Sequence, residues 1–155
     1  MKKKTISRDT PLLSITLRRY EKPNSLEGRE LLRKLCLSLG LLQPGDSRDV
    51  IVDVLHVLLL AREKQELISA EEVRRRVTEI RKQQNLPMIG IASPNIRRQL
   101  RRLKDSFLIE RVVNDYRIAE FSELSEIFEE KIEKFMFPQI VKRVKEYLKA
   151  VDERL

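Results

Sequence analysis

The first apolar pattern in the chain has a period of two. Over residues 11–20, the apolar residues Leu13, Ile15 and Leu17 alternate with serine and threonine. Successive side chains of a strand point to opposite faces, so this alternation predicts a short strand with one buried face. A turn is expected directly after it, over residues 21–24, where a proline interrupts the chain.

The spacing of apolar residues then changes to three and four, which indicates a helix. Ser25 can cap this helix, which is expected to run to about Leu39. Gly40 stands just past that end, where glycine accommodates a left-handed backbone. Cys36 is predicted to be a small buried side chain of the same helix. The apolar stripe consists of Leu31, Leu32, Leu35 and Leu39.

A second helix is expected after the proline- and glycine-containing break at residues 43–46. Asp46 or Ser47 can cap it, and it is predicted to span about Arg48–Glu66. Its middle is apolar nearly all round, so it should lie at the centre of the core. His56, within this apolar stretch, is predicted to be a core histidine hydrogen-bonded to a neighbour.

A short strand at Leu67-Ile68 is expected to precede a third helix that ends near Gln84. Ser69 and Glu72 form a capping box, in which each side chain bonds to the backbone amide of the other residue. The third helix also carries a cluster of basic residues. Glutamates three and four residues away can neutralise this cluster, so a solvated face is the favoured interpretation. The cluster comprises Arg74, Arg75, Arg76, Arg81 and Lys82.

A fourth helix is predicted over Ser93–Asp105, after a loop at residues 86–92. Ser93 is expected at the N-cap, with Pro94 at the first helical position. At about 100° per residue, the apolar residues of this helix fall within a narrow arc that should pack inward. Basic residues cover most of the remaining circumference, and Asn95 and Gln99 lie at its flank. The segment holds five basic residues, namely Arg97, Arg98, Arg101, Arg102 and Lys104, and one acidic residue, Asp105.

This helix has side chains suited to DNA recognition. Arginine can bridge two acceptors of guanine, and asparagine or glutamine can pair with adenine. An exposed helix face is often charged without functional meaning, but such a face normally mixes both signs. The single sign of this face therefore favours a polyanionic partner.

A hairpin is expected directly after the fourth helix, over residues 108–119. Its predicted turn is Asn114-Asp115, because both residue types tolerate left-handed conformations. Arg111 and Arg117 can reach phosphates, and Asn114 at the tip can approach a minor groove. A purely structural two-stranded flap is an equally good interpretation of this hairpin.

The C-terminal segment, residues 120–155, changes character. One amphipathic helix is expected over Phe121–Met136, and Pro138 is expected to break or kink it. Beyond it, apolar residues alternate in spacings of four and three, which is the repeat of a coiled-coil seam. This seam is predicted to form a homodimer, and the alternative is a helix that folds back on its own domain. The seam consists of Phe137, Val141, Val144, Leu148, Val151 and Leu155.

The net charge of +8 and the pI of about 9.8 agree with a polyanionic partner. Residues 120–155 hold nine acidic and seven basic residues, a net of −2, so residues 1–119 carry +10. One cysteine and one histidine exclude an internal disulfide framework and the usual zinc sites. No cofactor and no enzymatic activity are predicted, because no catalytic cluster or phosphate-binding glycine loop is present. The longest apolar stretch, residues 50–61, is too short to span a bilayer, so a cytoplasmic, nucleoid-associated protein is expected.

The run from Ser93 to Lys104, followed by Leu108-Ile109-Glu110-Arg111 and Tyr116-Arg117-Ile118-Ala119, resembles winged helix-turn-helix transcription regulators of archaea and bacteria. The resemblance covers about residues 47–119. It implies a recognition helix in the major groove of DNA and a hairpin wing beside it. The residues expected to contact DNA are Ser93, Asn95, Arg97, Arg98, Gln99, Arg101, Arg102, Lys104, Arg111, Asn114 and Arg117.

Together these patterns predict a mainly α fold with a small β-wing. The expected organisation is a basic flexible arm (1–10), a strand and helix (11–46), a winged-helix DNA-binding domain (47–119) and a helical dimerisation segment (120–155). The predicted function is sequence-specific binding of double-stranded DNA as a transcriptional regulator. A protein-docking module in a transcription, replication or chromosome-segregation complex is the first alternative, and binding of structured RNA is the second.

Overall fold

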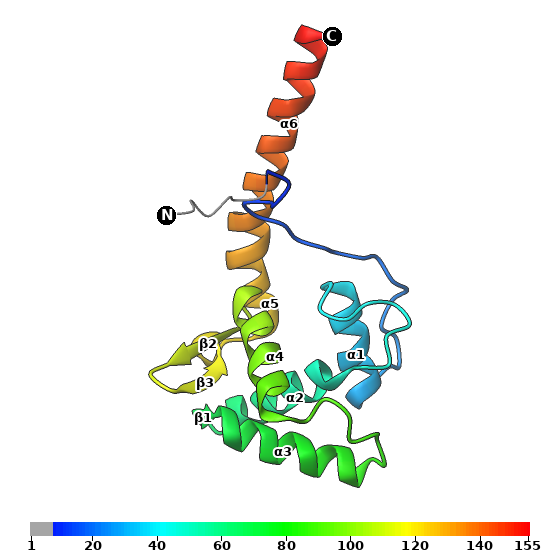
Figure 1. The fold of residues 1–155 in the computed structure, drawn as a ribbon, viewed down its shortest axis with the longest axis vertical. Helices are drawn as coiled ribbons and strands as arrows, with labels where there is room; N and C mark the ends of the chain where they lie inside the picture. Colours follow the sequence, from blue (N-terminus) through cyan, green and yellow to red (C-terminus); the bar gives the residue numbers. More distant parts are fainter. Residues whose placement is uncertain (1–7) are drawn as a thin grey trace, which may run out of the picture.

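The computed structural model describes residues 8–155, so most of the predicted basic arm lies outside the described residues. The fold is mainly helical with one small antiparallel sheet, as expected (Figure 1). The elements of the first part are α1 (Gly28–Ser38), α2 (Val50–Glu63), β1 (Ile68–Ser69), α3 (Ala70–Gln83), α4 (Ser93–Asp105), β2 (Ile109–Val112) and β3 (Asp115–Ile118). The C-terminal elements are the 3₁₀ turn η1 (Ala119–Phe121), α5 (Leu124–Ile127), the π-helical segment η2 (Phe128–Met136) and α6 (Phe137–Arg154).

Helix α2 lies at the centre of the core, as its sequence predicts. It packs against α1, α3, α4 and β3, and most of its residues are buried. The apolar residues Ile96, Leu100 and Leu103 of α4 are also buried in this core. His56 differs from expectation, because its Nδ1 is buried without a hydrogen-bond partner in the described part of the chain.

The sheet has the strand order β1-β3-β2, with both neighbours antiparallel to β3. Ile109 pairs with Ile118, and both side chains are buried. This register places the hairpin turn at Val113-Asn114, one residue earlier than predicted. The buried pair fixes the register, because a one-residue slip would move the strand side chains to the opposite face, away from the core. The turn therefore falls where this register places it.

The predicted caps of three helices are wrong, since α1, α2 and α4 begin after Glu27, Asp49 and Ala92 rather than at the expected serines or Asp46. None of these three residues makes a side-chain capping bond. The carboxylate of Asp49 instead binds arginines, and the Ser93 hydroxyl donates to Glu71 Oε1 at 3.0 Å. Asp49 and Ser93 therefore bind side chains of other elements instead of capping their own helices.

The cap of α3 is confirmed in one of its two halves. The Ser69 Oγ accepts from the Glu72 amide at 3.1 Å. The Glu72 carboxylate does not return to Ser69 but accepts from Arg75 and Arg76 at 2.6–2.9 Å. Charge-assisted hydrogen bonds to guanidinium groups are stronger than one to a neutral amide, so they replace the second half of the capping box.

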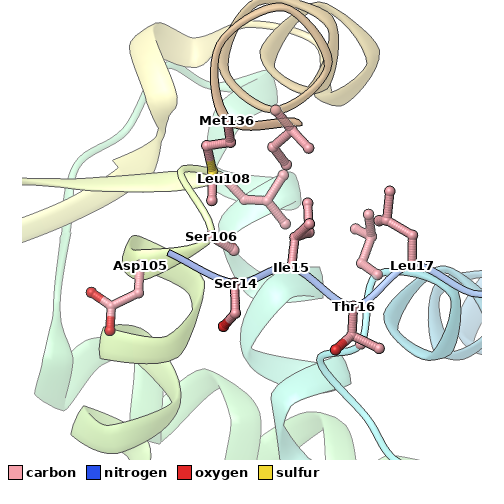
Figure 2. A pocket seen from close by; sticks show the side chains of 11 residues that line it. Ser14, Ile15, Thr16, Leu17, Asp105, Ser106, Leu108 and Met136 are labelled. Atoms are coloured by element: carbon pink, nitrogen blue, oxygen red, sulfur yellow. The ribbon is translucent and has the colours of Figure 1, made fainter. Parts of the chain in front are cut away.

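The strand predicted over residues 11–20 is wrong, because this segment is extended chain outside any sheet. It lies across the end of α4, where Ile15 meets Leu108 and Met136 around a cavity of about 210 Å³ (Figure 2). The Arg18 amide donates to the Ser38 carbonyl, and its guanidinium donates to the Leu37 carbonyl at 3.0 Å. The segment thus bonds to carbonyls at the C-terminus of α1. The end of a helix offers no strand edge with which the segment could form a sheet.

The C-terminal segment is helical without a break from Leu124 to Arg154. Pro138 does not break it as predicted. The preceding segment, η2, is π-helical, and π turns are a recognised way for a helix to accommodate an irregularity such as proline. Ile132 and Met136 are buried against the body, whereas α6 extends away from it (Figure 1).

A buried network of ion pairs connects the helices around α2. Asp53 is 0% exposed and Arg81 is 2% exposed, and their atoms Oδ2 and Nη1 lie 2.6 Å apart. Arg29 of α1 donates to both carboxylate oxygens of Asp53, and both arginines also contact Asp49. Two carboxylates thus pair with Arg29 and Arg81, and Arg33 lies at the edge of the network, 3.9 Å from Asp49. The expectation that Arg81 belongs to a solvated basic face is wrong.

Replacement of Arg81 by methionine should lower the free energy of unfolding by about 3 kcal/mol, because it leaves Asp53 buried with half of its partners. Urea denaturation at neutral pH measures this change. The adjacent Lys82→Met is the matched control, since Lys82 is exposed. It should change the free energy by less than about 0.5 kcal/mol. Equal effects of the two substitutions would contradict a structural role for the network.

Candidate nucleic-acid interface

The exposed face of α4 is formed almost entirely by cations. Arg97, Arg98, Arg101 and Lys104 are all exposed, and with about 100° per residue they share one arc of roughly 120°. Within the described part of the chain, none of the four side chains has a hydrogen bond or an ion pair. Asp105 is the single acidic residue on this arc. The helix therefore presents to solvent four cations that make no ion pair with residues 8–155, beside one carboxylate.

The polar residues on one flank of α4 are engaged within the protein. The Asn95 amide donates to the Gly90 carbonyl at 2.6 Å and accepts from Gln99 at 3.1 Å. Gln99 in turn accepts from Arg102 at 2.9 Å, and Arg102 also donates to the Leu41 carbonyl at 2.5 Å. These three side chains form a continuous hydrogen-bonded row. They hold α4 against the preceding loop and the segment after α1.

The loop before α4 is fixed by side chains from two helices. The Arg81 Nε donates to the Pro87 carbonyl at 2.8 Å, and the Arg74 Nε donates to the Ile91 carbonyl at 2.9 Å. Asn95 holds the carbonyl between them, that of Gly90. Irregular backbone needs such partners for its polar groups. The start of α4 is therefore positioned by α3 through a defined set of hydrogen bonds.

The basic cluster on α3 differs from the face of α4, because glutamates neutralise it. Arg75 pairs with Glu72 and Glu79, and Arg76 pairs with Glu66 and Glu72. Hydrogen bonds from Arg75 and Arg76 lower the pKa of Glu72 to about 2. These contacts confirm the predicted self-neutralised face for this part of the cluster. Ion pairs within the protein thus neutralise Arg75 and Arg76 of α3, whereas the cations on the exposed face of α4 have no such ion pairs in the part of the chain that the structure describes.

The hairpin places its predicted contact residues in two different environments. At the tip, Arg111 is exposed and donates to the Val113 carbonyl at 2.9 Å and to Asn114 Oδ1 at 3.0 Å. Arg117 lies nearer the base, where its Nε donates to Glu110 at 2.6 Å and its guanidinium stacks over the Phe121 ring. Arg111 and Asn114 are thus at the free end of the hairpin. Arg117 holds the base of the hairpin to the turn that follows it.

Val113 at the hairpin tip was not singled out from the sequence. Its side chain is 85% exposed, and its φ of +59° is unusual for a β-branched residue. Arg74 and Arg81, expected from the sequence only as part of a solvated cluster, are also positioning residues. A signal for Arg81 was available, since Asp53 interrupts an otherwise apolar helix and a buried carboxylate requires a cation.

Residues 8–155 contain no group of three histidine, cysteine, aspartate or glutamate side chains that could hold a metal ion. Burial raises the pKa of the Cys36 thiol to about 12, which keeps it protonated near neutral pH. Within the same range, no helix is long and apolar enough to cross a membrane.

The residues expected to contact DNA therefore fall into three groups. Arg97, Arg98, Arg101 and Lys104 share the open face of α4, and Arg111 and Asn114 lie at the hairpin tip. The remaining five, Ser93, Asn95, Gln99, Arg102 and Arg117, bond to other parts of the protein. No protein-family model, no curated protein and no solved structure matches this chain.

Proposed function

We propose that this protein is a winged helix-turn-helix regulator that binds double-stranded DNA with α4 in the major groove. The observation that carries the proposal is the exposed basic face of α4, beside a neutralised α3. The order α2, β1, α3, α4 and the β2–β3 hairpin is compatible with such a fold. A major groove is about 12 Å wide and admits one helix.

In this proposal, the cations on the α4 face have different roles, which follow from their positions on the helix. Arg97 and Arg101 lie at the centre of the exposed arc, so in the groove they approach the base edges. Their guanidinium groups suit the two major-groove acceptors of guanine. Arg98 and Lys104 lie at the two margins of the arc and approach the phosphates on either wall. Phosphate contacts fix the position of a protein on DNA, and base contacts select the sequence.

The row of Asn95, Gln99 and Arg102 serves, in this proposal, to hold α4 at a fixed angle. All three side chains already have protein partners that a base would have to displace. The hairpin tip, with Arg111 and Asn114, approaches the backbone or minor groove next to the contacted major groove. A regulator needs this combination of a rigid reading helix and a second contact, because sequence selectivity depends on precise register.

The combined Arg97→Ala and Arg101→Ala substitutions should weaken binding to a duplex selected by the wild-type protein at least about 30-fold, since each base contact contributes about 1–3 kcal/mol. Fluorescence anisotropy measures the dissociation constants at fixed salt concentration. The matched control is Lys131→Ala with Lys142→Ala, which removes the same net charge from exposed positions on the C-terminal helix. Equal losses in both double variants would show that only the overall charge matters and would contradict the proposal.

The marginal cations should behave differently from the central ones. Arg98→Ala with Lys104→Ala should weaken binding to all duplexes by a similar factor. It should also reduce the slope of log K against log salt by about 2, because each lost phosphate contact releases one counterion fewer. Titrations of a selected and a scrambled duplex at several salt concentrations provide the test. A loss confined to the selected duplex would reverse the assigned roles.

A further inference from the structure

Helix α6 carries an apolar stripe that residues 8–155 of its own chain leave uncovered. None of its residues is buried, and its helix contacts are with the preceding segment η2. Figure 1 shows α6 extending away from the body with no other element along its C-terminal half. The exposed apolar side chains include Phe137, Val144, Tyr147, Leu148, Val151 and Leu155, with exposures from 44% to 102%.

We propose that a second copy of this chain covers the α6 stripe, as a parallel coiled coil. The seam of residues 137, 141, 144, 148, 151 and 155 keeps the alternation of four and three that such a coil requires. In this heptad Val141, Leu148 and Leu155 occupy the a positions, and Phe137, Val144 and Val151 occupy the d positions. A helix of this length standing alone in water is marginally stable, so a partner along the stripe also stabilises α6 itself.

The charges of α6 are arranged as expected for a helix with one covered side. On the side away from the stripe, Arg143 pairs with Glu146 at 2.8 Å and Lys149 pairs with Glu153 at 4.0 Å. Lys145 lies beside the stripe, at an e position, and makes no ion pair within the described part of the chain. Charges at e and g positions select the partner helix and its direction in coiled coils.

The flanking residues favour a parallel rather than an antiparallel pair. In a parallel pair each g residue lies beside an e residue of the other helix, which places Tyr147 next to the partner's Asp152 and Ile140 next to the partner's Lys145. These neighbours allow a hydrogen bond and an apolar contact with the lysine stem. An antiparallel pair in which all six seam residues overlap would instead oppose Lys145 to the partner's Lys145. Self-repulsion therefore disfavours the antiparallel arrangement.

The position of the body is compatible with a parallel pair. Met136, the last residue of η2, is buried against the body, and the centre of the stripe lies about 100° around the helix from it. Each body therefore projects sideways from the seam, and the two-fold axis places the two bodies on opposite sides. Both bodies then lie at the same end of the coiled coil. This self-association does not depend on the proposed DNA binding, although it would let two α4 helices act on one duplex.

Sedimentation equilibrium of the full chain over a range of concentrations tests the association. The expected species has twice the chain mass of 18.3 kDa. Val144→Gln with Leu148→Gln should weaken association about 100-fold or more, whereas Lys142→Gln with Lys149→Gln on the outer side should leave it within about threefold. An unchanged thermal transition of the body shows that the stripe variant still folds. A monomeric wild type, a trimer or larger species, or equal effects of the two pairs would overturn the proposal.

Disulfide trapping tests the direction of the pair. Val144→Cys and Leu148→Cys are made separately and oxidised, with Lys149→Cys as the outer control. Native Cys36 does not interfere, because it is fully buried and burial raises the pKa of its thiol to about 12. A parallel pair opposes each seam residue to its own copy, so Val144→Cys alone and Leu148→Cys alone should each form linked dimers. Linkage only after the two variants are mixed would show an antiparallel pair and overturn the assigned direction.

Discussion

The arrangement of this protein depends on one buried carboxylate, that of Asp53. It stands in the most apolar helix of the chain and is completely shielded from water. A charged group in that position must be paired, and its partners Arg29 and Arg81 come from the helices on either side. Since Arg81 also holds the Pro87 carbonyl, the same network fixes the loop that leads into α4. The orientation of the candidate DNA-binding face thus begins at a charge in the core.

This arrangement separates arginines that position the structure from arginines that remain available. The positioning group is bonded to carboxylates or carbonyls, as Arg74, Arg81 and Arg102 illustrate. Arg97 and Arg101, on the open side of α4, have no such partner in the described part of the chain. A cation without an internal partner can bind a phosphate or a guanine without first breaking a bond within the protein. The available group is therefore the one suited to a polyanionic ligand.

Sequence patterns predicted the elements of this fold better than their polar contacts. The apolar period located α1 and α4, because the burial of one face dictates that period, and a stretch apolar nearly all round located α2. The strand expected over residues 11–20 failed because alternation does not supply a neighbouring strand. Its predicted buried face is also wrong, since Leu13 and Leu17 are exposed and Ile15 is only partly buried. Pro138, expected to break or kink the helix, does not break it, and a π-helical segment directly precedes α6. The roles of Asn95 and Gln99 depend on polar neighbours three to five residues away, which the apolar pattern does not describe. Arg102 adds a partner distant in the chain, the Leu41 carbonyl.

The most direct test of the account is an NMR titration of the arginine Nε–H groups with a short mixed-sequence DNA duplex at low salt. DNA binding through the α4 face predicts that the resonances of Arg97, Arg98 and Arg101 shift on addition of duplex, while those of the partly buried Arg29 and the buried Arg81 stay in place. Protein that binds no duplex, or shifts confined to arginines outside α4, would contradict the assignment of this helix face as the DNA-binding surface.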